Sequence, residues 1–131
     1  MNNKERNKGA ILIVEDENIV AMNLKMILQR KGYKIAGHAR TGQAAIEMAK
    51  ETAPDLIIMD INLGSGIDGI QAAGQILETS AIPILFATGN SDNATVKRAG
   101  EISTDGYLVK PYLADQLEEA VSNTIRKYKS S

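Results

Sequence analysis

The sequence contains no cysteine or tryptophan, and only one histidine and one phenylalanine, among its 131 residues. The lack of cysteine excludes disulfide bonds, thiolate zinc sites and thiol catalysis, and it favours a reducing compartment. An excess of basic charge is also missing, because 15 Lys and Arg residues face 16 Asp and Glu residues. Direct binding of this chain to nucleic acid is therefore not expected.

Long hydrophobic runs are missing as well. The opening MNNKERNKG is polar and is not followed by the apolar core of a signal peptide. Hydrophobic residues make up 44% and charged residues 24%, the composition of a soluble globular protein without disorder or membrane spanning. Because a signal peptide and cysteine are both missing, we expect a cytoplasmic location and no membrane partner. The length suits one domain. We expect a flexible tail over residues 1–9, the domain over 10–128 and a short tail over 129–131.

Five short apolar segments alternate with stretches of helical spacing. The predicted strands are Ala10 to Val14, Tyr33 to Ala39, Leu56 to Asp60, Ile82 to Ala87 and Gly106 to Val109. Repeated strand-then-helix units indicate an α/β fold with a parallel sheet covered by helices on both faces. The common order for five such strands is 2-1-3-4-5, the doubly wound, flavodoxin-like arrangement.

Helix starts and faces can be predicted from the same pattern. Thr41 and Ser91 are expected to cap helices, and Asp68 with Gln71 has the spacing of a capping box. One side of the last helix is expected to be apolar. It would carry Leu113, Leu117, Ala120, Val121, Thr124 and Tyr128.

Acidic residues follow two strands that are neighbours in this order. Glu15 and Asp16 follow the first strand, and Asp60 ends the third. Two negative charges about 4 Å apart repel by about 4 kcal/mol near a protein surface, so such a cluster must bind protons or a cation. An all-oxygen site with few protein ligands favours Mg²⁺ over a calcium cage. The main-chain carbonyl of Asn62 could add one oxygen.

Two further strands end in residues that suit phosphoryl chemistry. The fourth is followed by the hydroxyl of Thr88 and the fifth by the ammonium of Lys110. Together with a metal ion they could compensate the charge of a phosphoryl group. Asp60 could accept that group as an acyl phosphate.

With these residues in place, Gly9 to Tyr128 resembles the receiver domain of two-component response regulators. The matching motifs are ILIVEDE, LIIMDINL with a following DGI, ILFATG and GYLVKP. The resemblance implies that Asp60 is the phosphoacceptor. It implies that Asp16, Asp60 and the main-chain carbonyl of Asn62 bind Mg²⁺, and that Glu15 acts through metal-bound water.

The resemblance also implies a conformational switch. Thr88 and Lys110 would hold phosphoryl oxygens, the peptide bond between Lys110 and Pro111 would be cis, and Tyr107 would be the switch aromatic. Phosphorylation would turn Tyr107 inward and remodel the fourth helix, fifth strand and fifth helix, a surface for a downstream protein or a second copy. The chain would be a signalling phosphoacceptor rather than an enzyme, apart from its own phosphorylation and autodephosphorylation. The donor would be a sensor histidine kinase or a histidine phosphotransfer protein.

The chain departs from the family in one loop. Leu63-Gly64 stands where many members have Met-Pro, and the LGSG loop is one residue longer, so we expect it to be more mobile. Asn62 and Asn90 occupy positions that tune dephosphorylation in the family. His38 is the only histidine, and it is interpreted as a surface or strand-end residue.

Other functions fit the sequence less well. A flavodoxin-like cofactor module would need a phosphate-cradling first loop, which the acidic EDEN would repel. A phosphatase of the haloacid dehalogenase type would need an Asp at Asn62, and an EF-hand would need Gly at Ser65 and Glu at Gln71. The remaining alternative is a receiver-like interaction module that works without phosphorylation. The output domain or target is left open.

Overall fold

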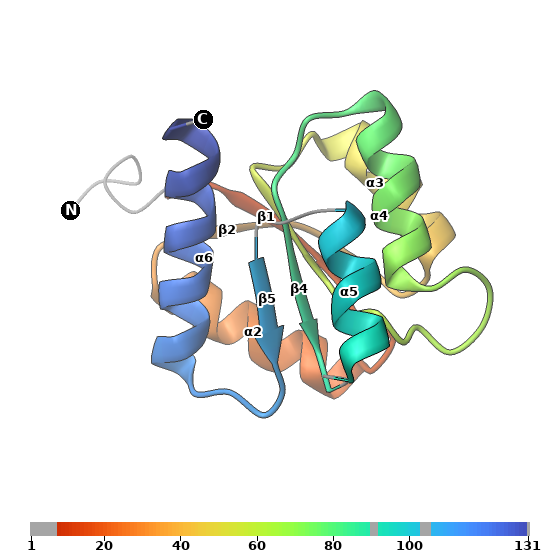
Figure 1. Ribbon diagram of the computed structural model, residues 1–131. Helices are drawn as coiled ribbons and strands as arrows, with labels where there is room; N and C mark the ends of the chain where they lie inside the picture. The colour runs from red at the N-terminus through yellow and green to blue at the C-terminus, as the bar shows by residue number, and fades with distance from the viewer. Residues whose placement is uncertain (1–7, 90–91, 103–105, 131) are drawn as a thin grey trace.

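The computed structural model describes residues 8–89, 92–102 and 106–130 (Figure 1). Its five parallel strands lie in the order β2-β1-β3-β4-β5, which confirms the predicted topology. The strands are β1 (Ala10–Val14), β2 (Lys34–Ala39), β3 (Leu56–Met59), β4 (Ile84–Thr88) and β5 (Gly106–Val109). The helices are α2 (Asn18–Arg30), α3 (Gly42–Thr52), α4 (Gly69–Thr79), α5 (Asn93–Ile102) and α6 (Ala114–Ser130).

Helices cover both faces of the sheet, because alternate strand residues point to opposite sides. Leu12, Ile57 and Phe86 belong to a core under α3, α4 and α5, whereas the adjacent strand residues belong to a core under α2 and α6. Figure 1 shows α4 and α5 on one side of the sheet and α6 on the other. No helix in the described part of the chain combines the length and apolar content needed to cross a bilayer.

The register of the strands brings their carboxyl ends to one edge. Val14, the last residue of β1, pairs with Ala39 at the end of β2 and with Met59 at the end of β3. Likewise Thr88 at the end of β4 pairs with Val109 at the end of β5. Residues that follow these strands therefore share one edge of the sheet.

The fourth strand starts later than its apolar run. Ile82 was expected to open this strand, but β4 begins at Ile84 and ends at Thr88. Pro83 has no N–H group to donate to a sheet, although its carbonyl accepts a hydrogen bond of 3.0 Å from Ile57 N. Ile82 is nevertheless buried, which explains its apolar character.

Side-chain caps fix the starts of three helices. Thr41 accepts a hydrogen bond of 3.0 Å from Ala44 N, and Asp68 with Gln71 forms the predicted capping box at α4. Ser91 lies outside the described residues. At α5 the described capping contact is made by Asp92, whose Oδ1 accepts a hydrogen bond of 2.8 Å from Thr95 N.

The last helix confirms most of its predicted apolar face, with one correction. Leu117, Val121 and Thr124 are buried, but Leu113 is 71% exposed. Leu113 precedes the helix: its carbonyl accepts the first helical hydrogen bond and its N–H donates to Gln116 Oε1, so its side chain is not on the packed face. The helix ends at Ser130, within the segment expected to be a tail.

Candidate functional site

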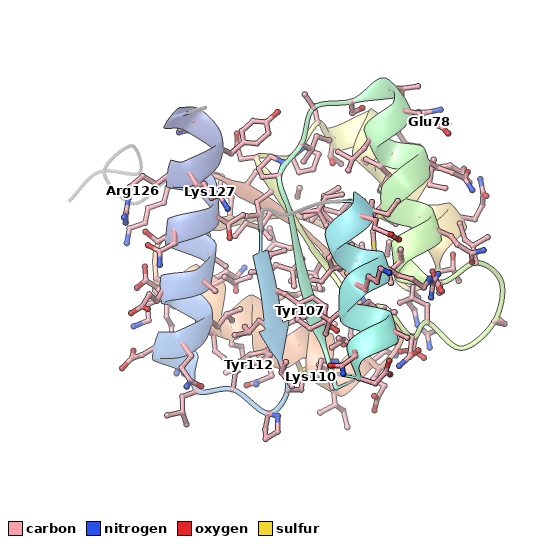
Figure 2. The ribbon with its side chains drawn as sticks, viewed as in Figure 1. Glu78, Tyr107, Lys110, Tyr112, Arg126 and Lys127 are labelled. Atoms are coloured by element: carbon pink, nitrogen blue, oxygen red, sulfur yellow. The ribbon has the colours of Figure 1, made fainter. Side chains whose placement is uncertain are left out.

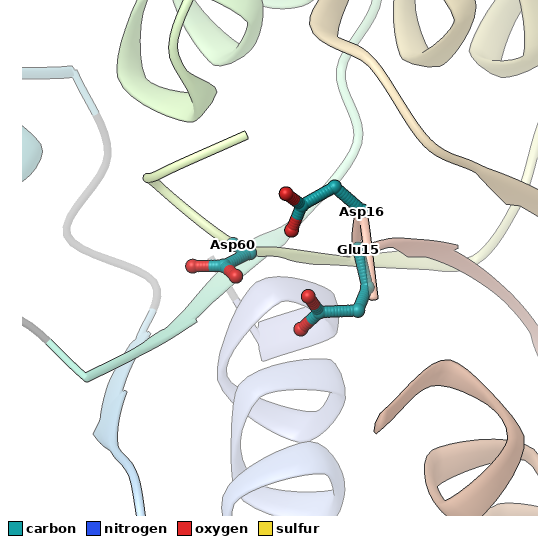
Figure 3. Close-up of side chains that lie close together, drawn as sticks. All are labelled: Glu15, Asp16 and Asp60. Atoms are coloured by element: carbon teal, nitrogen blue, oxygen red, sulfur yellow. The ribbon is translucent and has the colours of Figure 1, made fainter. Parts of the chain in front are cut away.

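Three carboxylates meet at the carboxyl edge of the sheet. One oxygen each from Glu15, Asp16 and Asp60 lies within 4.8 Å of the others, and Figure 3 shows the three side chains close together. Main-chain hydrogen bonds hold this arrangement, because Glu15 N donates to Ala39 O at 2.9 Å and Asp60 N donates to Val14 O at 3.0 Å. The predicted convergence of the acids is confirmed.

Lys110 brings one positive charge into this acidic cluster. Its Nζ lies 2.7 Å from Glu15 Oε1 and 3.2 Å from Asp60 Oδ2. The main chain of Lys110 is held at the same time, since Lys110 N donates to Thr88 O at 2.9 Å. The peptide bond between Lys110 and Pro111 is cis, as the resemblance implies. The ammonium therefore bridges carboxylates that follow β1 and β3.

Burial and charge shift the pKa values of Glu15 and Lys110. Burial raises the pKa of the Glu15 carboxyl, and the hydrogen bond from Lys110 only partly opposes it, while the charge of Asp60 raises it further. Burial alone would lower the pKa of Lys110, but the hydrogen bond to Glu15 and the charges of both carboxylates raise it overall. The ammonium is thus held in its charged form.

The two carboxylate oxygens of Asp60 differ in their surroundings. Its Oδ2 accepts from Lys110, but its Oδ1 is buried and has no hydrogen-bond partner among the described residues. A buried carboxylate oxygen without a partner costs free energy unless a ligand or cation approaches it. Three carboxylates against one ammonium form an all-oxygen donor set that fits Mg²⁺.

Thr88 and Tyr107 lie on β4 and β5, the two strands that precede the site on that side of the sheet. Thr88 is fully buried at the end of β4. Tyr107 is half-buried, and its ring centroid lies 6.4 Å from that of Phe86 at a tilt of 48°. Figure 2 shows Tyr107 alongside β5 and Lys110 at the end of that strand. Burial and the charge of Asp92 raise the pKa of the Tyr107 hydroxyl.

The extended loop after β3 runs past Asp16. Leu63 is buried and anchors the loop, whereas the side chain of Asn62 is exposed. Gly64 has a φ of +83°, and a Cβ atom there would lie 3.4 Å from Asp16 Oδ2. Gly66 also has a positive φ, of +78°. The two glycines of LGSG therefore meet a conformational need of this loop.

Gly69 closes the loop directly onto the backbone of Asp60. A Cβ atom at this position would lie 2.0 Å from the carbonyl oxygen of Asp60. Gly69 N donates to Ile61 O at 2.8 Å, which holds the two segments together. Only glycine fits here, so the Gly of the DGI motif positions the peptide that carries the central carboxylate.

Three residues near the site were not predicted from the sequence. His38 Nε2 lies 2.7 Å from Glu15 O, and Arg40 Nη2 donates to Asp16 O at 3.2 Å. Tyr112 is half-buried, and burial raises the pKa of its hydroxyl to about 12, with Lys110 opposing and the acids reinforcing the shift. Their positions in the sequence were the available signal. His38 and Arg40 flank Ala39, the last residue of β2, and Tyr112 follows Lys110-Pro111.

Comparison with known sequences gives a consistent picture. Residues 11–122 match the family model described as "Response regulator receiver domain". The chain is 37% identical over 119 residues to the transcriptional regulatory protein PdtaR of Mycobacterium tuberculosis, covering 91% of this chain but 58% of PdtaR. It is 34% identical over 116 residues to the chemotaxis protein CheY of Bacillus subtilis, covering 88% of this chain and 96% of CheY. The chain thus spans little more than half of PdtaR and nearly all of CheY.

Solved structures share the fold. The signal receiver domain of a modulated diguanylate cyclase from Desulfovibrio desulfuricans superimposes with a TM-score of 0.85 at 34% identity, covering 92% of this chain and 96% of that one. The N-terminal domain of a response regulator/sensory box/GGDEF protein from Carboxydothermus hydrogenoformans gives 0.84 at 37% identity, covering 92% and 97%.

Proposed function

Because the chain belongs to the family of response regulator receiver domains, we propose that it accepts a phosphoryl group on Asp60 in the presence of Mg²⁺. The donor is a phosphohistidine on a sensor histidine kinase or a histidine phosphotransfer protein. The acceptor then controls a downstream protein in the cytoplasm. The donor, the cation and the output are parts of this proposal.

The observation that carries the proposal is the state of the two oxygens of Asp60. Oδ2 is held by Lys110, which leaves Oδ1 buried and without a protein partner among the residues described. A nucleophile needs a free lone pair in a fixed place, and no described protein group uses the lone pairs of Oδ1. The arrangement supports Oδ1 as the attacking atom.

The proposed step balances as a simple transfer. A lone pair of Asp60 Oδ1 forms a bond to phosphorus, and the bond between phosphorus and the imidazole nitrogen of the donor breaks. The electron pair of that bond stays on the imidazole, which leaves as the free histidine of the donor. The product on this chain is an acyl phosphate, which water later hydrolyses to the carboxylate and inorganic phosphate.

The acidic cluster provides ligands for the cation. Asp16, Asp60 and the main-chain carbonyl of Asn62 would bind Mg²⁺ directly, and Glu15 would act through metal-bound water. When bound, Mg²⁺ supplies positive charge that offsets the carboxylates and the phosphoryl oxygens. Lys110, which follows β5, supplies a second positive charge, and its ion pair with Glu15 already orients the ammonium.

Thr88 and Tyr107 are proposed to carry the signal outward. Thr88 would donate its hydroxyl to a phosphoryl oxygen, and Tyr107 would turn inward behind it, changing the surface of α5, β5 and α6. Exposed apolar residues already lie on these elements, including Val96 at 41% and Val109 at 40% exposure. This surface would bind the downstream protein or a second copy of the chain.

The deciding experiment is treatment with a small-molecule phosphodonor and Mg²⁺, followed by intact-mass measurement. We expect a gain of one phosphoryl group. Asp60→Asn and removal of the cation with EDTA should each abolish the gain. Asp55→Asn is a matched control, because Asp55 caps the opposite end of the sheet through a hydrogen bond to Ala10 N and should leave the gain unchanged.

A negative result would also be informative. If the wild-type chain gains no mass while it binds Mg²⁺ tightly, phosphoacceptance is wrong and the chain is a receiver-like interaction module that works without phosphorylation. If Asp60→Asn still gains a phosphoryl group, the acceptor is a different residue.

A further inference from the structure

Two side chains at the end of β2 bind the main chain of the acidic turn that follows β1. His38 Nε2 lies 2.7 Å from Glu15 O, and because a carbonyl oxygen can only accept, Nε2 carries the proton. The guanidinium of Arg40 donates to Asp16 O through Nη2 at 3.2 Å and Nε at 3.4 Å. Neither side chain contacts a carboxylate of the cluster in these hydrogen bonds.

These contacts begin where the sheet ends. Glu15 N donates to Ala39 O at 2.9 Å, and the strand pairing of β1 with β2 ends at Val14 and Ala39. Beyond this point the carbonyls of Glu15 and Asp16 have no strand partner, so side chains or water must satisfy them. His38 and Arg40 therefore take over from the sheet as the groups that hold this turn.

Holding the turn matters because its side chains repel one another. One carboxylate oxygen each of Glu15 and Asp16 lies within 4.8 Å of an oxygen of Asp60. Mutual repulsion favours conformations in which the carboxylates move apart. A hard cation binds tightly only when its ligands are already in place, and groups that orient ligands typically change metal affinity by about 10- to 100-fold. Fixing two successive carbonyls fixes the peptide planes from which both acidic side chains project.

We propose that His38 and Arg40 are positioning residues that hold the Glu15–Asp16 turn in the conformation that binds a divalent cation. This inference rests on the proposed function, in which that turn supplies cation ligands. It goes further by assigning a role to one residue of β2 and to the residue that follows this strand, neither of which would touch the cation itself.

The charge of Arg40 makes the inference sharply testable. Electrostatics alone predicts that removal of a positive charge near the site tightens cation binding. Positioning predicts the reverse, since Arg40→Met keeps the apolar stem but loses both donors to Asp16 O. Lys34→Met is the matched control, because Lys34 is exposed at the start of the same strand.

The experiment titrates each variant of the 131-residue chain with Mn²⁺ and follows free Mn²⁺ by electron paramagnetic resonance. We expect His38→Leu and Arg40→Met each to raise the dissociation constant about tenfold. His38→Gln restores an N–H donor and should stay within about threefold of wild type, as should Lys34→Met. Thermal unfolding without cation, measured by circular dichroism, checks that each variant is folded.

The outcomes separate this inference from the proposed function. Suppose that the wild type binds Mn²⁺ and gains a phosphoryl group. If folded Arg40→Met and His38→Leu then bind Mn²⁺ as tightly as the wild type or more tightly, the positioning role is wrong and the proposed function stands. Equal weakening by His38→Gln and His38→Leu also counts against it, because the hydrogen bond would then be irrelevant. Failure of the wild type to bind Mn²⁺ overturns both the cation site and the inference built on it.

Discussion

Lys110 and Glu15 form the shorter of the two ion pairs in the acidic cluster, at 2.7 Å compared with 3.2 Å for Lys110 and Asp60. Glu15 is only 1% exposed, and 95 residues separate the two partners in the chain. Lys110 thus ties the end of β5 to the turn after β1, across the strands β3 and β4 that lie between them. Its ammonium is oriented toward Asp60, the proposed phosphoacceptor, by its ion pair with Glu15.

Loss of this ammonium should destabilise the fold. In Lys110→Met the buried carboxylate of Glu15 has no counter-charge, and breaking a buried pair in this way typically costs about 3 kcal/mol. Because the pKa of Glu15 is already raised above 4.5, the loss should shrink as pH falls through that raised pKa and the carboxyl becomes neutral. Urea unfolding at neutral and mildly acidic pH measures both effects.

A surface pair provides the control for that variant. Lys31 lies 3.2 Å from Asp115, but the side chains are 36% and 91% exposed. Lys31→Met should therefore lower the unfolding free energy by less than about 1 kcal/mol at either pH. Equal losses in the two lysine variants would show that the Lys110 pair has no special role in stability.

Neutralising one acid of the cluster should stabilise the metal-free protein and remove its response to cation. Asp16→Asn reduces repulsion among the three carboxylates, and we expect a gain of about 1 kcal/mol in unfolding free energy without Mg²⁺. Mg²⁺ at about 100 times its dissociation constant should stabilise the wild type by about 2.7 kcal/mol but leave Asp16→Asn nearly unchanged.

The matched control for this variant is Glu17→Gln. Glu17 is exposed, makes no side-chain cap at α2 and lies outside the carboxylate cluster. Thermal unfolding with and without Mg²⁺ should show a wild-type response in Glu17→Gln. A full Mg²⁺ response in Asp16→Asn would remove Asp16 from the set of cation ligands.

Gly69 should tolerate no side chain. In Gly69→Ala the new Cβ would meet the carbonyl oxygen of Asp60 at 2.0 Å, and relieving that clash must shift the backbone of this proposed phosphoacceptor. We expect a loss of about 3 kcal/mol in unfolding free energy, together with loss of phosphoryl uptake.

Gly100 allows the same substitution to be made without a clash. It lies in α5, and a Cβ atom there would have no neighbour within 4 Å. Gly100→Ala should stabilise the chain by about 0.5 to 1 kcal/mol, because alanine favours a helix over glycine. Urea unfolding of the two variants compares them directly, and equal stability of the pair would contradict the predicted clash at Gly69.

The sequence was enough to predict which residues lie at the carboxyl edge of the sheet. Buried parallel strands show as apolar runs, and their order brings residues that follow them to one edge. Asp60 and Glu15 therefore could be placed together before any coordinates were known. His38 was interpreted as a surface or strand-end residue, and it lies next to the last residue of β2. Its hydrogen bond to a carbonyl depends on side-chain direction, which no sequence pattern encodes.

Other details depend on competition between neighbouring residues. Ser91 and Asp92 are both good capping residues, and the described hydrogen bond of α5 is made by Asp92. Leu113 has the spacing of the apolar face of α6, yet it precedes the helix and is exposed. A shift of one residue at a helix start changes which side chains are buried, and local propensity does not distinguish such close alternatives.

Tyr112 should report on the charge of the site at high pH. Burial raises the pKa of its hydroxyl from 10.0 to about 12, so the unfolded chain releases this proton before the folded chain does. The stability that neutral Tyr112 contributes is therefore present below pH 10 and is lost as pH rises to about 12. We expect the unfolding free energy to fall by about 2 kcal/mol over this range. Tyr112→Phe should not show this loss, because phenylalanine does not titrate. Tyrosinate absorbance of the folded protein and urea unfolding across this range measure the two quantities.

Because the charge of Asp60 raises the pKa of Tyr112, Asp60→Asn should lower it. Titration of Tyr112 near pH 10 in the folded wild type would contradict its burial beside the acidic cluster.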